Sequence, residues 1–326
     1  MKIVIPGGSG QVGTILARHF HAKGDEVVVL SREFRTLPWR VAPWDGRTLD
    51  TWVKELDAAD VVINLAGRSV NCRYTPANRG AILDSRVDSV RVLGQALAQA
   101  VPRHRTWLQA STATIYAHRY DAPNDEATGI IGGLEPDAPD RWRFSIDVAK
   151  AWESAFNAAV APRTRKVALR SAMVMSADRG GIFDTLLGLV RVGLGGTSGD
   201  GQQYVSWVHE SDFVRAIDWV LAHPQVFGAV NVAAPEPLPN AEFMAALRQA
   251  WGMPVGLPAK RWMLEVGAIF LGTETELILK SRRVVPGRLL KAGFTFEHPR
   301  WPEAAALLCD QARGAHVRSS ELGVRS

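Results

Sequence analysis

Three glycines at a constant spacing of three residues constrain the fold of this chain more than any other feature. Gly7, Gly10 and Gly13 come directly after the apolar run Lys2–Pro6 and directly before the amphipathic run Thr14–Lys23, and a second apolar run comes next. This order predicts a strand, a glycine turn, a helix and a second strand, which together form one βαβ unit.

The chemistry of dinucleotide recognition explains this spacing. Glycines let the backbone approach a pyrophosphate closely, and the N-terminus of the following helix offers unpaired N–H groups and a positive dipole. We therefore predict that the turn binds a dinucleotide through Gly7, Gly10, Gln11, Val12 and Gly13. The alternative is a tight turn that needs glycine for its geometry alone.

Strand-like and helix-like runs continue to alternate as far as residue 174. Further strands are predicted at 26–30, 60–67, 105–112 and 166–174, and further helices at 49–58, 81–100 and 145–159, with a polar loop at 121–143. Alternating strands and helices form a parallel sheet, and near-continuous apolar strands are typical of a sheet covered on both faces. The predicted fold class is α/β, with a doubly wound parallel Rossmann sheet.

The regular alternation of strand-like and helix-like runs ends near Gly180. A glycine-rich segment follows at 193–203, then a short strand at 204–209 and helices at Ala241–Trp251, Arg261–Leu271 and Thr275–Arg282. We predict a Rossmann domain at 1–179 with returning elements near 205–233, a smaller, mainly helical substrate domain at 180–308, and a tail at 309–326. From Gly314 the tail is predicted to be disordered.

Composition excludes several classes of protein. The 326 residues are 47% hydrophobic and 22% charged, an ordinary globular balance, and no apolar run reaches the roughly 18–20 residues of a membrane helix. The net charge of +5 is scattered without a basic run, which argues against nucleic acid as a partner. Cys72 and Cys309 are too few for a disulfide framework or a metal site. We predict a cytoplasmic protein without a metal.

The end of the second predicted strand bears on which dinucleotide binds. An acidic residue there would accept hydrogen bonds from both ribose hydroxyls and select NAD. The chain has Ser31 and Arg32 instead, and a guanidinium beside a hydroxyl suits a 2′-phosphate. We predict NADP(H) as the cofactor. The alternatives are that Arg32 is a solvated surface charge, or that Glu33 turns toward the hydroxyls.

Motifs along nearly the whole chain carry a family resemblance. GGSGQVG at Gly7–Gly13, NLAG at Asn64–Gly67 and STATIY at Ser111–Tyr116 resemble the extended short-chain dehydrogenase/reductase superfamily, of the epimerase and dehydratase type. Later segments resemble its atypical, epimerase-like subfamily, which ends in its own C-terminal domain of unknown function: WDG at Trp44–Gly46, SRVDS at Ser85–Ser89, LRSAMVMS at Leu169–Ser176 and RRVVPGRLLKAGFTF at Arg282–Phe296.

The resemblance implies further residues that contact the cofactor. They lie at the ends of strands and on one helix: Asp45, Leu65, Ala66, Gly67, Arg86 and Val174. Arg86 is expected on the phosphate side and Val174 at the nicotinamide half. For Arg86 the alternative is an ion pair on the helix surface with Asp88 or a neighbouring residue. A homodimer is compatible with the superfamily.

The resemblance also implies a catalytic tyrosine and lysine spaced Y-x-x-x-K on one helix face, and here the pattern is broken. Aligning on Lys150 puts Ile146 in the place of the tyrosine, whereas aligning on Glu153 puts Ser145 and Ala149 at the two positions. Since the lysine normally lowers the tyrosine pKa for proton transfer, the standard mechanism does not carry over.

Three residues remain as catalytic candidates. Thr112 fits the hydroxyl position at a strand end, Tyr116 follows it by four residues, and Lys150 offers a proton or a positive charge. His209, beside a predicted helix N-cap, is better explained as a structural residue. The sequence favours an NADP(H)-dependent oxidoreductase or epimerase-like enzyme that acts on a small carbonyl or sugar-derived substrate. The alternative is a sensor or scaffold that binds NADPH without turnover.

Overall fold

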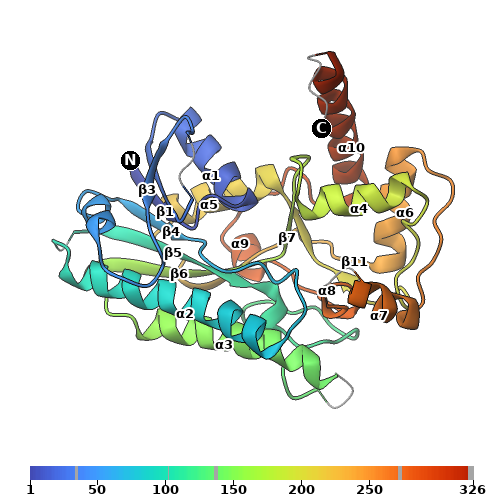
Figure 1. Ribbon diagram of the computed structural model, residues 1–326, viewed down its shortest axis with the longest axis horizontal. Helices are drawn as coiled ribbons and strands as arrows, with labels where there is room; N and C mark the ends of the chain where they lie inside the picture. The colour runs from blue at the N-terminus through green and yellow to red at the C-terminus, as the bar shows by residue number, and fades with distance from the viewer. Residues whose placement is uncertain (34–35, 102, 136–138, 271–273, 322–326) are drawn as a thin grey trace.

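A seven-stranded sheet, entirely parallel, forms the centre of the computed structural model, which describes residues 1–33, 36–101, 103–135, 139–270 and 274–321 (Figure 1). Its strand order is β10-β6-β5-β4-β1-β2-β3. The strands are β1 (Lys2–Pro6), β2 (Glu26–Ser31), β3 (Arg40–Pro43), β4 (Val61–Asn64), β5 (Arg105–Thr112), β6 (Thr164–Ser171) and β10 (Gly228–Val232). The order 3-2-1-4-5-6 within it is that of a Rossmann sheet, so the predicted fold class is confirmed.

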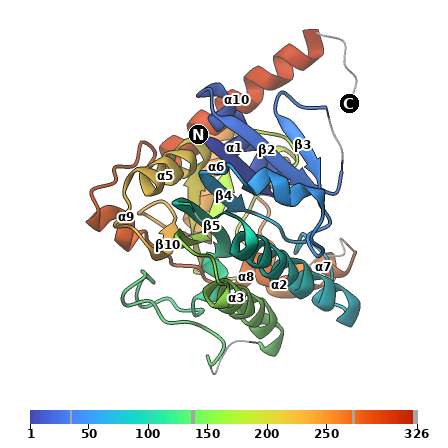
Figure 2. The same ribbon diagram turned by 90° about the vertical axis from the view of Figure 1, so that its left-hand side faces the viewer.

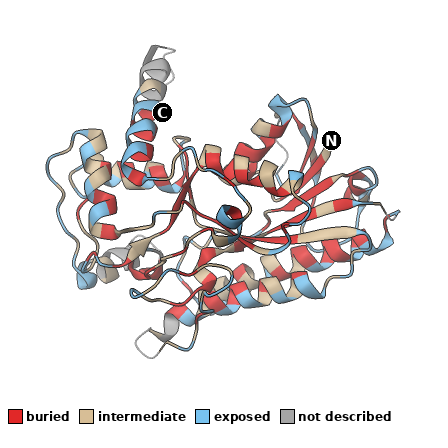
Figure 3. Cartoon of the chain, turned by 180° about the vertical axis from the view of Figure 1, so that it is seen from behind, coloured by how far each residue is buried: buried red, intermediate tan, exposed pale blue. Residues whose placement is uncertain are grey.

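Helices cover both faces of this sheet (Figures 1 and 2). Helices α2 (Pro76–Gln99) and α3 (Asp140–Ala158) lie side by side on one face, and α1 (Gln11–Ala22) and α5 (Glu210–Ala222) lie on the other. Successive strand residues point to opposite faces, so Ile3 and Ile5 join the core under α1 and α5, whereas Val4 joins the core under α2 and α3. This two-sided burial explains the near-continuous apolar strands; Figure 3 shows how fully they are buried.

A second group of elements, formed by residues from the C-terminal half of the chain, packs beside the sheet (Figure 1). It has helices α4 (Ile182–Arg191), α6 (Asn240–Trp251), α7 (Arg261–Phe270), α8 (Glu276–Leu279) and α10 (Trp301–Glu321), and strands β7 (Met173–Met175), β8 (Tyr204–Val205), β9 (Trp207–His209) and β11 (Leu238–Pro239). Helix α9 (Gly287–Lys291) packs on β10 instead, and its Leu289 belongs to the main core. β7 pairs with β9 and β8 with β11. The core of this group is aromatic, with Trp301 stacked on Phe243 and edge-on to Trp207.

Several elements differ from the sequence-based predictions. The predicted strand 166–174 divides into β6 and β7, and the predicted strand 204–209 divides into β8 and β9, because each half pairs with a different neighbour. The predicted helix 49–58 is a 3-10 helix, η1 (Thr51–Leu56), and a second, η2 (Ala113–Ile115), follows β5. Strand β3 was not predicted.

The C-terminal segment also differs from its prediction. Helix α10 continues through Glu321, so the stretch from Gly314 to that point is helical rather than disordered. Leu271, the predicted last residue of the helix that begins at Arg261, and residues 322–326 lie outside the described residues. The domain boundaries stay predictions. Within the part of the chain that the structure describes, no helix has the length and apolar character needed to cross a membrane.

Candidate functional site

The predicted cofactor residues gather at one edge of the sheet. Gly7 follows β1, Ser31 ends β2, Leu65 follows β4 and Thr112 ends β5. Because the strands are parallel, these carboxyl ends lie on the same edge, where open α/β sheets bind their ligands. The switch in connection direction falls between β1 and β4, so Gly7 and Leu65 stand on either side of it.

Two of the three motif glycines are required by the protein's own packing. A β-carbon on Gly7 would lie 2.6 Å from the main chain of Ala66, and Gly7 has a φ of +73°, which favours glycine. A β-carbon on Gly13 would lie 2.4 Å from Gly8, where helix α1 crosses the turn. These two positions agree with both explanations of the motif, since tight packing alone accounts for them.

Gly10 is different, because nothing in the described protein would touch a β-carbon there. No heavy atom lies within 4 Å of that β-carbon, and its φ of −78° is open to any residue. Gly10 is the N-cap of α1 and provides no side-chain hydrogen bond to the helix. The space beside it and the uncapped N–H groups make a cradle for an anion. Gly10 therefore favours the explanation that the motif binds a pyrophosphate over the explanation that it is only a tight turn.

The first two residues of α1 complete this cradle. The Nε2 atom of Gln11 is buried with no hydrogen-bond partner among the described residues, and the side chain lies against Gly181. Buried amide donors without a partner are rare, and a group bound beside Gly10 would satisfy this one. Val12 packs against the main core instead, so its side chain anchors the helix.

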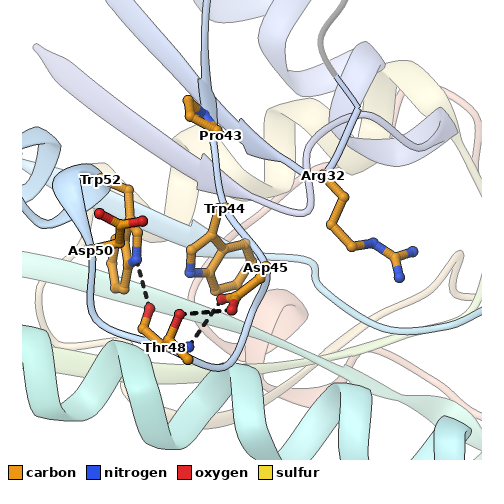
Figure 4. Close-up of a pocket in the computed structure, with 7 residues that line it drawn as sticks. All are labelled: Arg32, Pro43, Trp44, Asp45, Thr48, Asp50 and Trp52. Carbon is orange, nitrogen blue, oxygen red and sulfur yellow. Dashed lines mark hydrogen bonds between the residues drawn. The ribbon is translucent and has the colours of Figure 1, made fainter.

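A cavity of about 310 Å³ lies beyond the end of β2 (Figure 4). It is lined by Arg32, Pro43, Trp44, Asp45, Thr48, Asp50 and Trp52. The two predicted residues Arg32 and Asp45 therefore line the same cavity. Ser31 is buried, and its Oγ accepts a hydrogen bond from the Glu33 backbone N–H at 3.1 Å.

Asp45 is fixed as an anion by its own loop. Its carboxylate accepts hydrogen bonds from the backbone N–H groups of Arg47 and Thr48 and from the Thr48 hydroxyl, at 2.7–2.9 Å. Desolvation raises the pKa of Asp45, but these hydrogen bonds outweigh it and leave the pKa below its usual value. Among the described residues, none forms a hydrogen bond or ion pair with the Arg32 guanidinium. The guanidinium is therefore not held away from the cavity that it lines.

Arg86 is a partly buried cation without a carboxylate partner in the described part of the chain. Its guanidinium donates to the backbone carbonyls of Arg68 and Ile82 at 3.0 Å and lies over the ring of Trp152. Burial lowers its pKa to about 10. Asp88 pairs with Arg47 and Arg91, so the alternative of an Arg86–Asp88 ion pair is wrong.

The remaining strand-end residues set the shape of the site. Gly67 lies directly against Arg86, since a β-carbon there would be 3.1 Å from the guanidinium carbon. The Ala66 backbone N–H donates to the Asn64 side chain at 3.1 Å, which fixes the chain as it leaves β4, and Leu65 packs against the core. Val174 pairs with Val208 in β9, and its side chain is buried in the main core.

The catalytic candidates occupy different surroundings. The Oγ1 atom of Thr112 accepts a hydrogen bond from the Thr114 backbone N–H at 3.1 Å at the end of β5. Lys150, on α3, donates from Nζ to the Gly132 carbonyl at 2.8 Å. Lys150 therefore lies against the loop that precedes its helix.

Tyr116 is built into a buried network. Its hydroxyl donates to Asn231 Oδ1 and accepts from Arg170 Nη1, both at 2.9 Å, and its side chain is only 2% exposed. Burial raises the pKa of Tyr116 although Arg170 opposes this. Arg170 also forms a two-point ion pair with Glu153. The structure thus gives the Tyr116 hydroxyl two protein partners and does not bring it to Lys150.

Sequence reasoning missed a buried polar cluster near the same edge. It joins Tyr74, Ser145, Glu276 and Lys280, which come from three separate parts of the chain. The only local signal for it was Ser145 at one of the two alignments of the broken Y-x-x-x-K pattern. The acidic and basic residues at 274–282 resemble an ordinary solvated helix in the sequence.

Comparisons with known proteins agree with this geometry. Residues 3–233 match the model of the NAD dependent epimerase/dehydratase family, and residues 261–308 match a domain of unknown function (DUF1731). The chain is 30% identical over 304 residues to epimerase family protein SDR39U1 of Bos taurus, covering 92% of this chain and 96% of that protein. It is 30% identical over 303 residues to epimerase family protein Mb2239 of Mycobacterium bovis, covering 93% and 95%.

A solved structure shows the same fold. The crystal structure of human epimerase family protein SDR39U1 (isoform 2) with NADPH superposes with a TM-score of 0.82 at 26% identity, covering 95% of this chain and 99% of that one. The resemblance stated from the motifs is therefore confirmed over both parts of the chain. This protein belongs to the NAD-dependent epimerase/dehydratase family.

Proposed function

We propose that the protein is an NADP(H)-dependent oxidoreductase or epimerase-like enzyme that acts on a small carbonyl or sugar-derived substrate. The observation that carries the proposal is the open N-terminus of α1 at Gly10, together with the cavity that Arg32 and Asp45 share at the end of β2. An anion cradle and an arginine-lined cavity on neighbouring strands suit the two ends of an adenosine diphosphate with a 2′-phosphate.

Different residues of the chain would bind different parts of this cofactor. The N–H groups at the start of α1 and the buried Gln11 amide would hold the pyrophosphate, and Arg32 the 2′-phosphate. Asp45, held ionised, would accept hydrogen bonds from the adenosine. Arg86 adds a partly buried positive charge behind Gly67. Bound NADPH would supply a hydride at its nicotinamide, and the human relative solved with NADPH supports this choice of cofactor.

The substrate would lie outside the end of β5, next to Thr112. The Thr112 hydroxyl accepts from the Thr114 backbone N–H, which leaves its own hydrogen free to donate to a substrate oxygen. Lys150 remains a second candidate in this region, while Tyr116 is the weakest of the three because both its hydrogen-bonding roles are occupied. The two free cysteines, Cys72 and Cys309, support the proposal of a cytoplasmic protein.

The competing proposal is a protein that binds NADPH without turnover. It is favoured by the helix face of α3, where Ser145 or Ile146 stands in place of a tyrosine, and by the enclosed Tyr116. Turnover would then have to come from a residue outside the usual catalytic set.

Titration of the purified protein with NADPH and NADH tests both proposals. Energy transfer from tryptophan to nicotinamide reports binding, and the NADPH complex is then incubated with a panel of aldehydes and ketones while absorbance at the nicotinamide band is followed. Tight NADPH binding with oxidation by any panel member supports the enzyme. Tight binding without oxidation supports the sensor, and absence of binding contradicts both.

A further inference from the structure

A second, smaller cavity lies between α3 and the segment that follows α8. Its volume is about 50 Å³, room for a group of a few non-hydrogen atoms. Its lining includes His118, Glu135, Trp142, Arg143, Ile146 and Lys280. Ile146 is one of the two residues that stand in place of the missing tyrosine, so this cavity occupies the space which that side chain would face.

Lys280 brings a buried ammonium group to this cavity. It is 2% exposed, and its Nζ donates one hydrogen bond, to the Thr114 carbonyl at 2.8 Å. The nearest carboxylate oxygen, Oε1 of Glu276, lies 3.9 Å away, too far for a hydrogen bond, and is itself buried without a hydrogen-bond partner. An ammonium has three N–H donors, and burying it with one of them satisfied is costly. The fold retains donor capacity at this point.

Glu276 is held in place by α3. Its Oε2 accepts a hydrogen bond from the Ser145 hydroxyl at 2.6 Å, and Ser145 Oγ lies 3.4 Å from the hydroxyl of Tyr74. Ser145 is the other residue that stands in place of the tyrosine. Both alignments of the broken motif therefore lead to the same structural cluster, and Lys280 is the cation of that cluster which also lines the cavity.

The other polar groups of the cavity determine what it can bind. His118 Nδ1 accepts from the Ser281 backbone N–H at 2.8 Å, so a neutral His118 carries its proton on Nε2. The two oxygens of Glu135 accept from the backbone N–H groups of His118 and Gly133. Each Glu135 oxygen thus already accepts a backbone hydrogen bond, and the lining also has N–H donors on His118, Arg143 and Lys280, an arrangement that suits a carbonyl oxygen.

A short chain of contacts links Lys280 to the end of β5. Lys280 bonds the Thr114 carbonyl, and the Thr114 backbone N–H bonds the Thr112 hydroxyl. The cavity therefore lies next to the strand end where the proposed function puts the substrate. Lys280 comes from the part of the chain that matches a domain of unknown function, so that domain would complete the site.

We propose that this cavity receives the carbonyl oxygen of the substrate and that Lys280 donates the proton to it. The inference rests on the proposed reductase activity. As the hydride that bound NADPH would supply adds to the carbonyl carbon, the π electron pair of the C=O bond moves to oxygen, and that oxygen takes a proton from the Lys280 ammonium. The product is an alcohol, and the neutral Lys280 amine regains a proton from water.

The acidity of Lys280 fits this role. Burial and the nearby Arg282 lower its pKa to about 8, against the opposing influence of Glu276 and Glu135. A group with a pKa near the working pH is an efficient proton donor and is readily recharged. His118, whose pKa is lowered mainly by burial, is neutral beside it.

Covalent labelling tests whether a small carbonyl reaches Lys280, without any need for cofactor. The full-length protein is treated at pH 8 with glyoxylate and cyanoborohydride, and labelled lysines are identified by peptide mass spectrometry. We expect Lys280 to be labelled about tenfold faster or more than the exposed Lys291 on α9, since only the neutral amine reacts and an ordinary lysine is almost fully protonated at this pH. Labelling no faster than that of Lys291 would overturn the subsite.

Turnover tests the proton donation. With the carbonyl compound found by the panel, Lys280→Met is expected to lower kcat about 100-fold with an unchanged Kd for NADPH, and Lys280→Arg to restore substrate KM but not kcat. Lys291→Met is the matched control. Lys280→Met alone leaves the Glu276 carboxylate buried without its cation and could unfold the protein. The double variant K280M/E276Q also removes that carboxylate, and its melting temperature shows whether it folds, so that a loss of kcat can be assigned to the missing ammonium.

The outcomes separate the two proposals. Fast labelling with wild-type turnover in Lys280→Met would overturn the proton donation. A wild-type protein that binds NADPH and reduces no carbonyl would overturn the enzyme and with it the donation, while the labelling would still decide whether the cavity admits a carbonyl.

Discussion

The guanidinium of Arg170 holds the carboxylate of Glu153 through two hydrogen bonds of 2.8 Å, between strand β6 and helix α3. Both side chains are nearly buried, at 12% and 13% exposure. The Ser111 hydroxyl donates to the same carboxylate at 2.6 Å, and Arg170 reaches Tyr116. This pair therefore ties the end of β5, the sheet and α3 together under the candidate site.

Replacing Arg170 by Met should destabilise the fold strongly. The substitution leaves Glu153 buried without its cation, which costs about 3–5 kcal/mol of unfolding free energy. The measurement is urea unfolding followed by tryptophan fluorescence. Arg300→Met, which breaks the exposed Arg300–Glu303 pair, is the control and should cost less than about 1 kcal/mol. Equal, small losses in the two variants would show that the buried pair contributes no more than a surface one.

The glycines of the turn should separate stability from binding. Gly7→Ala puts a methyl group 2.6 Å from the Ala66 main chain at a φ of +73°, so the melting temperature should fall by several degrees. Gly10→Ala meets nothing within 4 Å and should keep the melting temperature within about 1–2 °C, yet lower NADPH affinity at least tenfold. Calorimetry and fluorescence titration measure the two effects. Unchanged NADPH affinity in Gly10→Ala would mean that no phosphate lies there.

Arg32 should decide between NADPH and NADH. Arg32→Ala removes a charge-assisted contact to the 2′-phosphate, worth about 1.5–3 kcal/mol, so NADPH affinity should fall roughly 10- to 100-fold while NADH affinity changes little. Arg313→Ala changes the net charge equally but lies on α10, and it should affect neither cofactor. Equal losses for NADPH and NADH in Arg32→Ala would leave Arg32 as a surface charge.

His209 should make stability depend on pH. It is the N-cap of α5 and accepts from the Ser211 backbone N–H through Nδ1, and burial lowers its pKa to about 4, with a further contribution from His298, whose ring is 4.1 Å away. Because the unfolded chain binds the proton more readily, stability is complete above pH 6.5 and is lost as the pH falls from 6.5 toward 4, by up to about 3 kcal/mol.

The variant His209→Asn tests this cap. Asparagine also caps helices but does not titrate in this range. Its unfolding free energy in urea should therefore fall less than that of the wild-type protein between pH 7 and pH 5. If the wild-type protein and the variant lose the same unfolding free energy over this interval, the pH dependence comes from other groups, such as His118, whose pKa is also lowered by burial.

The first half of the fold was predictable because its signals are local. The strand Lys2–Pro6, the glycine turn and the helix after it lie within two dozen residues, and apolar periodicity sets the order of strands and helices. Ser31 and Arg32 follow from the end of β2, and Thr112 from the end of β5, since parallel strands deliver their carboxyl ends to one edge. Between Ser171 and Met173 the chain changes from one neighbouring strand to another, and the apolar pattern predicted one continuous strand there instead of two.

The sequence by itself determined the α/β class, the dinucleotide turn and the absence of the usual catalytic tyrosine, because each of these depends on a pattern of residues that lie close together along the chain. Only the tertiary structure decided that Gly10 is open while Gly7 is packed, that Tyr116 is enclosed, and that Lys280 lies 2.8 Å from the carbonyl of Thr114, 166 residues earlier. The physical reason is that burial, cavities and shifted pKa values arise from contacts between distant segments, and a charged residue such as Lys280 has no local pattern that marks it as buried.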